Sequence, residues 1–224
     1  MAKLVYKRGN GKWEARYKKG VSESGKTLYS TVYGNTEEEA IKKRIEKLGY
    51  DPEKPVTPTR LNLLILGAGT HGKDVKDLAE ASHVFHKIAF LDDKLTGEDI
   101  IGRCKDVLRF HGEYPCAFIA IGDNEIRKKY AKLLKECNFL IPNIISPMAS
   151  VAPAAKLGEG VVIMPQSTVG AAEIGDFVIL TPNSYINSDS SVGSYSRVAC
   201  GGMVLKGSKV PEGTLIESGQ IYGK

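Results

Sequence analysis

The chain has 224 residues, of which 42% are hydrophobic and 25% are charged, a composition typical of a globular protein that is long enough for two or three small domains. No apolar run approaches the ~18 residues of a membrane span, and the start MAKLVYKRG lacks a signal-peptide core, so we expect a cytoplasmic protein without a membrane partner. The four cysteines have no CxxC spacing, which predicts neither a zinc site nor a disulfide framework, and we expect no metal.

The positive charge is concentrated at the N-terminal end of the chain. Residues 1–60 hold 14 Lys and Arg against 8 Asp and Glu, a net charge of +6, and the remainder holds 17 against 18, a net charge of −1. The basic character therefore belongs to the N-terminal segment alone.

The first segment, residues 1–49, has the pattern of three strands and a helix. Strands are expected near 5–6, 13–17 and 27–33, because turn-forming sequences separate alternating apolar and charged residues. Thr36 followed by Glu39 is a capping-box signature for a helix that ends at Gly49. Residues 50–60, with three prolines, are predicted to be a linker.

The second segment, residues 61–146, has the pattern of a Rossmann-like α/β domain. Strands are predicted at 61–66, 87–91, 117–121 and 140–145, and helices from the glycine-rich turn to residue 81 and over 125–137. The first strand runs directly into the sequence Gly67-Ala68-Gly69-Thr70-His71-Gly72.

This glycine-rich turn predicts a nucleotide site. A turn of this kind lets backbone N–H groups approach a phosphate, and Asp92 or Asp93, at the end of the next strand, could accept ribose hydroxyl hydrogen bonds. The alternative is that Gly67, Gly69 and Gly72 only permit tight packing between strand and helix.

The third segment, residues 147–224, repeats with a period of six residues, which neither an amphipathic helix nor a half-buried strand produces. A parallel β-helix of hexapeptide repeats does, with three sides per coil and about four coils. Such a solenoid usually buries one face against neighbouring copies, so we expect a homotrimer, with residues 214–224 capping the end. The repeating aliphatic positions are Val151, Leu157, Ile163, Val169, Ile174, Leu180, Ile186, Val192, Val198, Val204, Val210 and Ile216.

The motifs LILGAGTHG, AFLDD, FIAIGDNEIRKKY and GVVIMPQSTVGAAEIGDFVIL together resemble the nucleotide-amino-sugar acetyltransferases that make bacillosamine, and their relatives that acylate sialic acid. The resemblance implies a UDP-sugar substrate, acetyl-CoA as acyl donor, N- or O-acetylation in surface glycan biosynthesis, and a left-handed β-helix that trimerises. It places seven residues at the nucleotide site: Gly67, Gly69, His71, Asp92, Asp93, Gly122 and Asn124. Arg127 is expected to be structural or to steer phosphate.

The chain departs from this family at the catalytic base. Ser188 occupies the place of the family histidine, and the flanking acid is kept as Asp189. Either Asp189 or water is a candidate for the base role. Thr181 stands where the family has an asparagine that contacts the acceptor sugar. Gly201 falls where a family glycine offers its N–H to the thioester of acetyl-CoA. The chain is therefore either an impaired acetyltransferase or an inactive binding or regulatory protein on the same scaffold.

The N-terminal segment resembles the arm-type DNA-binding domain of tyrosine recombinases, in the stretch GNGKWEARYKKGVSESGKTLYSTVYGNTEEEA. This resemblance implies duplex DNA as a partner of residues 1–49, through a sheet face with Arg16, Lys18 and Lys26 beside Trp13 and Tyr17. The alternative is a solvated basic sheet used for protein contact or as a tether.

Overall fold

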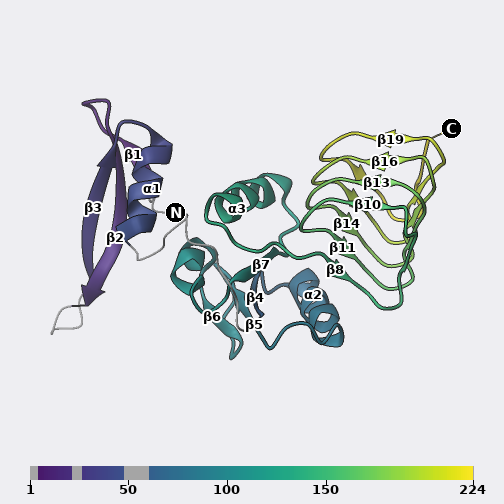
Figure 1. Ribbon diagram of the computed structural model, residues 1–224, viewed down its shortest axis with the longest axis horizontal. Coiled ribbons are helices and arrows are strands. Elements are labelled where there is room, and N and C mark those ends of the chain that lie inside the picture. Colours follow the sequence, from purple (N-terminus) through teal and green to yellow (C-terminus); the bar gives the residue numbers. More distant parts are fainter. Residues whose placement is uncertain (1–4, 22–26, 48–60, 224) are drawn as a thin grey trace. The chain divides into compact units, whose positions relative to one another are not determined.

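A computed structural model describes residues 5–21, 27–47 and 61–223. The chain divides into two compact units, Met1–Pro55 and Val56–Lys224 (Figure 1). The predicted linker, residues 50–60, and the predicted helix end at Gly49 lie outside the described residues.

The first unit is an antiparallel sheet with one helix. Its strands are β1 (Val5–Lys7), β2 (Trp13–Val21) and β3 (Thr27–Gly34), and they pair in the order β1-β2-β3. Helix α1 (Glu37–Lys47) begins as the capping box predicts, because the Thr36 hydroxyl accepts the N–H of Glu39 at 3.1 Å. The Glu39 carboxylate returns to the N–H of Asn35, at 2.6 Å, one residue before the cap.

The prediction that Arg16 shares one face of this sheet with Trp13 and Tyr17 is wrong. Alternation along β2 places Trp13 and Tyr17 on the same side as the fully buried Ala15, and Arg16 on the opposite side. Arg16 lies instead over the ring of Tyr6, 5.4 Å from its centroid. Lys26 and the side chain of Lys18 lie outside the described residues.

The second unit begins with a four-stranded parallel sheet in the order β6-β5-β4-β7. Its strands are β4 (Asn62–Leu66), β5 (Lys87–Leu91), β6 (Ile100–Gly102) and β7 (Cys116–Ile119), with helices α2 (Thr70–Ala81) and α3 (Asn124–Glu136) and a 3-10 helix, η1 (Cys104–Phe110). Strand β6 and η1 were not predicted. Of the strand predicted at residues 140–145, Leu140 forms a single parallel bridge with Cys116 of β7. Ile144–Ile145 form β8, which belongs to the β-helix.

The β-helix is built from three parallel sheets, ordered β20-β17-β14-β11-β8, β21-β18-β15-β12-β9 and β10-β13-β16-β19, which we call sheets C, D and E. This arrangement fits a left-handed β-helix. The strands after β8 are β9 (Ser150–Val151), β10 (Lys156–Leu157), β11 (Val162–Ile163), β12 (Thr168–Val169), β13 (Glu173–Ile174), β14 (Ile179–Leu180), β15 (Tyr185–Ile186), β16 (Ser191–Val192), β17 (Arg197–Val198), β18 (Met203–Val204), β19 (Lys209–Val210), β20 (Leu215–Ile216) and β21 (Ile221–Tyr222).

Each of the twelve aliphatic repeat positions is the second residue of one of these strands and lies in or against one interior cluster. The repeat continues one strand further at each end, to Ile145 and Tyr222. Within the stretch predicted to cap the end, residues 214–224, Leu215–Ile216 and Ile221–Tyr222 continue the sheets.

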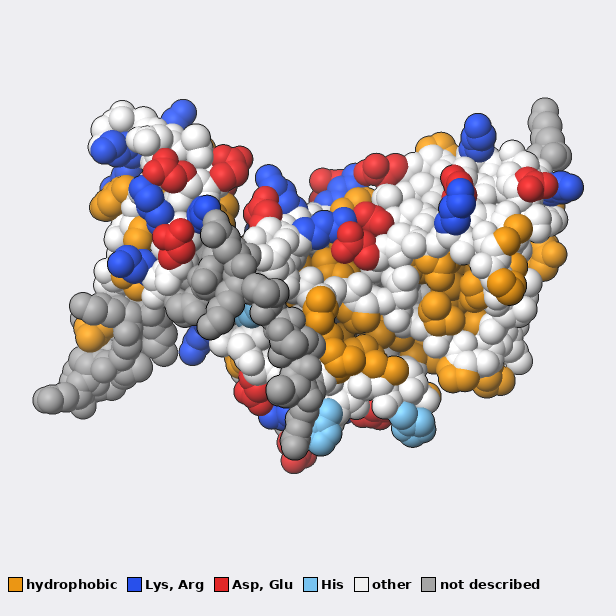
Figure 2. Space-filling view, in the orientation of Figure 1, with side chains coloured by type: hydrophobic (Ala, Val, Ile, Leu, Met, Phe, Trp, Pro, Cys, Tyr) orange, Lys and Arg blue, Asp and Glu red, His pale blue; other side chains and the backbone are white. Residues whose placement is uncertain are grey.

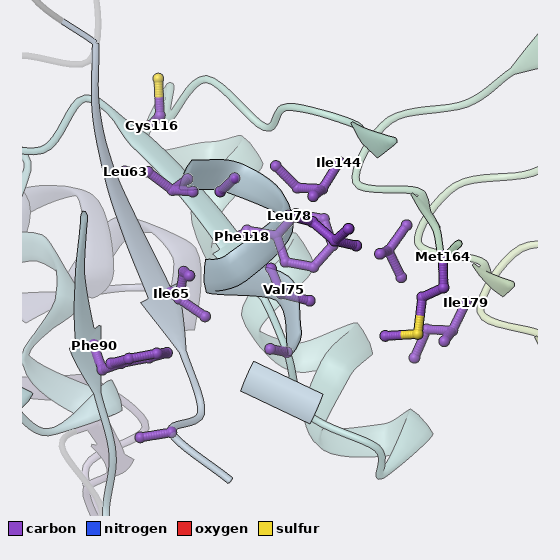
Figure 3. Packing of buried hydrophobic residues seen from close by; sticks show 14 residues of the cluster. Leu63, Ile65, Val75, Leu78, Phe90, Cys116, Phe118, Ile144, Met164 and Ile179 are labelled. Carbon is purple, nitrogen blue, oxygen red and sulfur yellow. The ribbon is translucent and has the colours of Figure 1, made fainter. Parts of the chain in front are cut away.

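Helix α2 joins the α/β sheet to the β-helix in one hydrophobic core. Figure 3 shows Val75 and Leu78 of α2 between the sheet residues, such as Phe118, and Met164 and Ile179 of the β-helix. Ion pairs reinforce the junction at α3, where Lys135 contacts Asp176 at 2.9 Å, in a region where Figure 2 shows charges of both signs. The carboxyl edge of the parallel sheet, which carries the glycine-rich turn, and the β-helix are therefore parts of one packed unit.

Within the described ranges, no helix is both long and apolar enough to span a bilayer.

Candidate functional site

The glycine-rich turn lies at the carboxyl edge of the parallel sheet, and its glycines serve different purposes. Gly67 has φ +102°, and a Cβ on it would lie 2.7 Å from the carbonyl oxygen of Ala120, at the end of β7. A Cβ on Gly72 would lie 2.0 Å from the carbonyl oxygen of Gly67. Around Gly69, in contrast, a Cβ would meet no atom within 4 Å. Gly67 and Gly72 thus allow close packing, and Gly69 leaves open space at the start of α2.

Asp92 holds the glycine-rich turn. One carboxylate oxygen accepts the N–H of Ala68 and the other accepts the N–H groups of Lys94 and Leu95, each at 2.8 Å. Partial burial of the carboxyl raises its pKa, but these three backbone donors outweigh that effect, and the pKa of Asp92 is lowered. Asp93 is exposed. The Asp93 carboxylate is therefore open to a ribose hydroxyl. At Asp92 the hydroxyl would share carboxylate oxygens that already accept backbone N–H groups.

His71 lies in the first turn of α2, and its buried Nε2 has no hydrogen-bond partner among the described residues. Burial, and after it the charges of Arg197 and Arg127, together lower its pKa to about 4. The ring is consequently neutral near pH 7 and can offer one nitrogen as a donor or an acceptor.

Arg127 ties the second loop of this edge together from the first turn of α3. Its side chain is only 1% exposed and donates to the carbonyl oxygens of Ile121 at 2.9 Å, Gly122 at 3.1 Å and Tyr195 at 2.6 Å. It also donates to Asn124 Oδ1 at 2.6 Å, while the amide nitrogen of Asn124 reaches the Gly213 carbonyl at 3.1 Å. Asn124 therefore links α3 to the β-helix, and Gly122 remains exposed.

Ser188 lies in the turn between β15 and β16. Its hydroxyl accepts the N–H of Ala171, one coil below, at 3.2 Å. Two other turns use the same device, since Asp176 accepts the N–H of Glu159 at 3.2 Å and Ser194 accepts the N–H of Asp176 at 3.0 Å. Ser188 thus holds successive coils together in the same way as residues at other corners of the prism.

Asp189 follows in the same turn, at φ +60°, with its carboxylate 3.3 Å from the ammonium of Lys206. Both side chains are about two thirds exposed or more, so the pair is in reach of solvent. Asp189 is the described acid nearest in sequence to Ser188.

Thr181 and Gly201 belong to the other corner of sheet D, one coil apart. The Thr181 side chain is buried, and its hydroxyl donates to the carbonyl of Val198 at 2.9 Å. The N–H of Gly201 donates to the carbonyl of Pro182 at 3.1 Å. The expectation of a Gly201 N–H directed at a thioester is therefore not met in this structure, because the adjacent coil accepts that hydrogen bond.

The expected residues thus form two groups. Gly67, Gly69, His71, Asp92, Asp93, Gly122 and Asn124 lie in the loops and first helical turns at the sheet edge. Thr181, Ser188, Asp189 and Gly201 lie at two corners of the β-helix. Over residues 5–21, 27–47 and 61–223, no three His, Cys, Asp or Glu side chains are grouped as metal ligands.

Parts of the chain are similar to known proteins. A family model described as the PglD N-terminal domain matches residues 62–134. UDP-N-acetylbacillosamine N-acetyltransferase of Bacillus subtilis is 34% identical over 110 residues, which are 46% of this chain and 51% of that protein. The match therefore spans about half the length of this curated relative.

Solved structures extend the similarity over more than two thirds of the chain. The acetyltransferase domain of PglB from Neisseria gonorrhoeae aligns with a TM-score of 0.64 at 26% identity, over 72% of this chain and 91% of that chain. A variant of perosamine N-acetyltransferase from Caulobacter crescentus, in complex with CoA and GDP-perosamine, aligns with a TM-score of 0.60 at 25% identity, over 73% and 89% of the two chains. The chain is thus similar to a UDP-N-acetylbacillosamine N-acetyltransferase in sequence and to acetyltransferases of known structure in fold.

Arg197 is a charged residue near the carboxyl edge of the sheet that no sequence motif singled out. Arg197, the outward residue of β17, is exposed, and among the described residues no carboxylate lies within ion-pair distance of it. Its charge nevertheless acts on His71 and Arg127 across the junction. The signal in the sequence is a single cation in an otherwise apolar column of sheet C.

Proposed function

We propose that this chain is an acetyl-CoA-dependent N-acetyltransferase that acts in the cytoplasm on a UDP-linked amino sugar for surface glycan synthesis, and that Ser188 makes it slow. The main support is the shared core around α2, which fixes the glycine-rich edge against the β-helix. That arrangement suits a reaction in which one domain holds the nucleotide and the other the acyl donor. The acetyl coenzyme A complex of the PglB domain, 27% identical with a TM-score of 0.57 over 70% of this chain and 87% of that chain, supports the choice of donor.

The proposed reaction needs a proton acceptor. The amine nitrogen of the sugar attacks the thioester carbonyl, the carbon–sulfur bond breaks, the CoA thiolate leaves and takes up a proton, and the amine must lose one. Ser188 cannot accept that proton near neutral pH without help, and absence of a positioned base forfeits ~10²- to 10⁴-fold in rate. Asp189, or a water molecule that it holds, is the proposed substitute, since its carboxylate is exposed beside Ser188.

The test of this activity is release of free CoA from acetyl-CoA in the presence of UDP-linked and GDP-linked amino sugars, with mass spectrometry of the sugar product. We expect slow turnover with a UDP-linked acceptor. Asp189→Asn should lower kcat by about tenfold or more. The matched control is Glu173→Gln, which removes an exposed carboxylate from sheet E and should leave kcat unchanged. Absence of turnover with every acceptor, together with retained UDP binding, would favour an inactive nucleotide-sugar-binding protein.

A homotrimer is part of the same proposal. The outward residues of sheet D include an apolar column of Tyr185, Met203 and Ile221, which are 42%, 41% and 58% exposed. The outward residues of sheet E are instead polar or charged, such as Lys156 and Glu173. Sheet D is thus the face suited to contact between copies. Light scattering should report a trimer for the wild type and a smaller species for Met203→Asp, and a wild-type monomer would contradict the proposal.

DNA binding by the first unit is a second candidate function. Arg8 and Arg16 lie on one face of the sheet, about half exposed, and Tyr29 and Tyr33 on β3 share that face by their pairing register. Both arginines contact the buried Glu14, which offsets part of their charge. Exposed cations beside aromatic rings suit phosphate and groove contacts.

Fluorescence anisotropy with duplex DNA at several salt concentrations tests this candidate function. If Arg16 contacts a phosphate, Arg16→Ala should reduce the slope of log affinity against log salt by about 1. The matched control Lys42→Ala, on the exposed side of α1, should not change it. Wild-type protein without salt-dependent affinity would remove the DNA function and leave the acetyltransferase proposal untouched.

A further inference from the structure

One column of outward residues on sheet C runs along the face that helix α2 covers. The register of β8, β11, β14 and β17 aligns Ile144, Val162, Ile179 and Arg197 in that order. The first three are buried in the cluster that contains Val75 of α2 (Figure 3). Leu215 of β20 follows Arg197 in register, so Arg197 is the single cation in an otherwise apolar column.

His71 is the residue of α2 that continues this contact. It lies four residues before Val75, so both side chains are on the same face of the helix. Arg197 is the register neighbour of Ile179, which shares a buried cluster with Val75 and with Ala68 of the glycine-rich turn. This packing agrees with the effect of the Arg197 charge on His71.

Arg127, in the first turn of α3, adds a second guanidinium near His71 and Arg197. It is buried, and one of its donors bonds the carbonyl of Tyr195, two residues before Arg197. Its hydrogen bonds within the described residues go to carbonyl or amide oxygens and to no carboxylate, and its Nε is buried without a partner. Burial and then the charge of Arg197 lower the pKa of Arg127 to about 10. A buried charge is costly unless a counter-charge or full hydrogen bonding compensates it.

These three basic groups lie at the point where the order of the sheet reverses. Strand β4 has β5 on one side and β7 on the other, so the loops after β4 and β7 separate at this point. Open α/β sheets bind ligands outside the carboxyl ends of their strands at such a point. The α2 N-terminus here has Gly69 at the cap position with no side-chain hydrogen bond to cap it, which leaves N–H groups for an anion.

We infer that Arg197, from the β-helix, is a positioning residue that binds the diphosphate of the nucleotide sugar opposite the N-terminus of α2. The inference rests on the proposed function and deepens it. The N–H groups of α2 and the guanidinium of Arg197 are two separate sources of positive charge, which suits two phosphates better than one. Because Arg197 belongs to a coil of the β-helix, this contact fixes the nucleotide relative to the acyl-transfer surface.

The test is calorimetric titration of uridine, UMP and UDP into the full chain, the Arg197→Gln variant and a matched control. The control is Lys209→Ala, which removes an exposed positive charge from sheet E, two strands further along the chain. We expect Arg197→Gln to weaken UDP binding by about tenfold to a hundredfold, as loss of a charge-assisted hydrogen bond does. Uridine binding should be unchanged, UMP binding should fall less than UDP binding, and Lys209→Ala should match the wild type.

Two results would overturn the inference and leave the proposed function in place. One is UDP affinity in Arg197→Gln equal to that of the wild type. The other is an equal loss for uridine and UDP, which would indicate a general structural effect. Arg197→Lys provides a further check, because it keeps the charge and should recover part of the UDP affinity. A wild-type chain that binds neither UDP nor GDP would instead contradict the proposed function itself, and with it this inference.

Discussion

Substitution of the glycines in the turn after β4 by alanine separates packing from ligand approach. In Gly72→Ala the new methyl group would lie 2.0 Å from the carbonyl oxygen of Gly67 and 2.9 Å from its carbon, both of them backbone atoms. Overpacking of this kind usually costs ~1–3 kcal/mol, and because rigid backbone must move here we expect about 3 kcal/mol or more of the free energy of unfolding to be lost. In Gly67→Ala, a clash of 2.7 Å with Ala120 adds to a φ of +102°, which L-residues adopt at a cost of ~1–2 kcal/mol.

Gly69→Ala is the matched control, because its Cβ meets no atom within 4 Å and its backbone, at φ −70° and ψ −172°, is extended. Loss of conformational freedom in the unfolded chain stabilises such a variant by ~0.4–1 kcal/mol, and the poorer helix cap offsets this. The free energy of unfolding should therefore change by less than about 1 kcal/mol. The open space at Gly69 is where a phosphate would approach, so UDP affinity should fall while stability is retained.

Urea denaturation followed by far-ultraviolet circular dichroism, together with UDP titration of each variant, checks these values. The reasoning is refuted if Gly72→Ala is as stable as Gly69→Ala. If Gly69→Ala binds UDP as the wild type does, the packing argument stands, but the glycine-rich turn is not the phosphate site.

Three further predictions concern the second unit. Ile186→Ala empties an interior position that is 0% exposed and should lower the free energy of unfolding, measured by urea denaturation, by ~2–5 kcal/mol. Lys209→Ala, on the outside of sheet E, should lower it by less than ~0.5 kcal/mol. Equal losses would contradict the interior placement of Ile186. His71 takes up a proton at about pH 6.5 when unfolded but only at about pH 4 when folded, so the free energy of unfolding should fall by up to about 3 kcal/mol as the pH drops through that window, and His71→Gln should remove that dependence. Maleimide should label native protein first at the exposed Cys200 and not at the buried Cys104, because burial raises the pKa of the Cys104 thiol to about 12. Fast labelling that persists in Cys200→Ser would contradict this order.

The β-helix could be predicted from the sequence because each hexad carries its own signal. An inward aliphatic residue at every sixth position needs no knowledge of distant contacts. The two terminal strands were missed for physical reasons. Ile145 lies at the open end of the prism and is 36% exposed, and it follows a stretch that resembles a strand of the α/β sheet. Tyr222 is an aromatic residue at a position otherwise filled by smaller aliphatic ones.

The role of Arg197 could not be read from the six-residue period. The outward column that contains it repeats every 17 or 18 residues, the length of one coil, and its meaning depends on which helix covers the column. The turn residues show a similar limit. The sequence places Thr181 and Gly201 at a corner, but only the stacking of coils shows that the Thr181 hydroxyl and the Gly201 N–H are bonded to the adjacent coil.

Acetyl-transfer rates of Ser188→His and Ser194→His test the central claim most directly. Both serines lie in turns, and each accepts one backbone N–H from the coil below, at 3.2 Å and 3.0 Å, so the two substitutions remove equivalent contacts. With acetyl-CoA and a UDP-linked amino sugar, we predict that Ser188→His is faster than the wild type by ~10²-fold or more and that Ser194→His is not. A Ser188→His variant no faster than the wild type and Ser194→His would contradict the account of this chain as an acetyltransferase slowed by loss of its base.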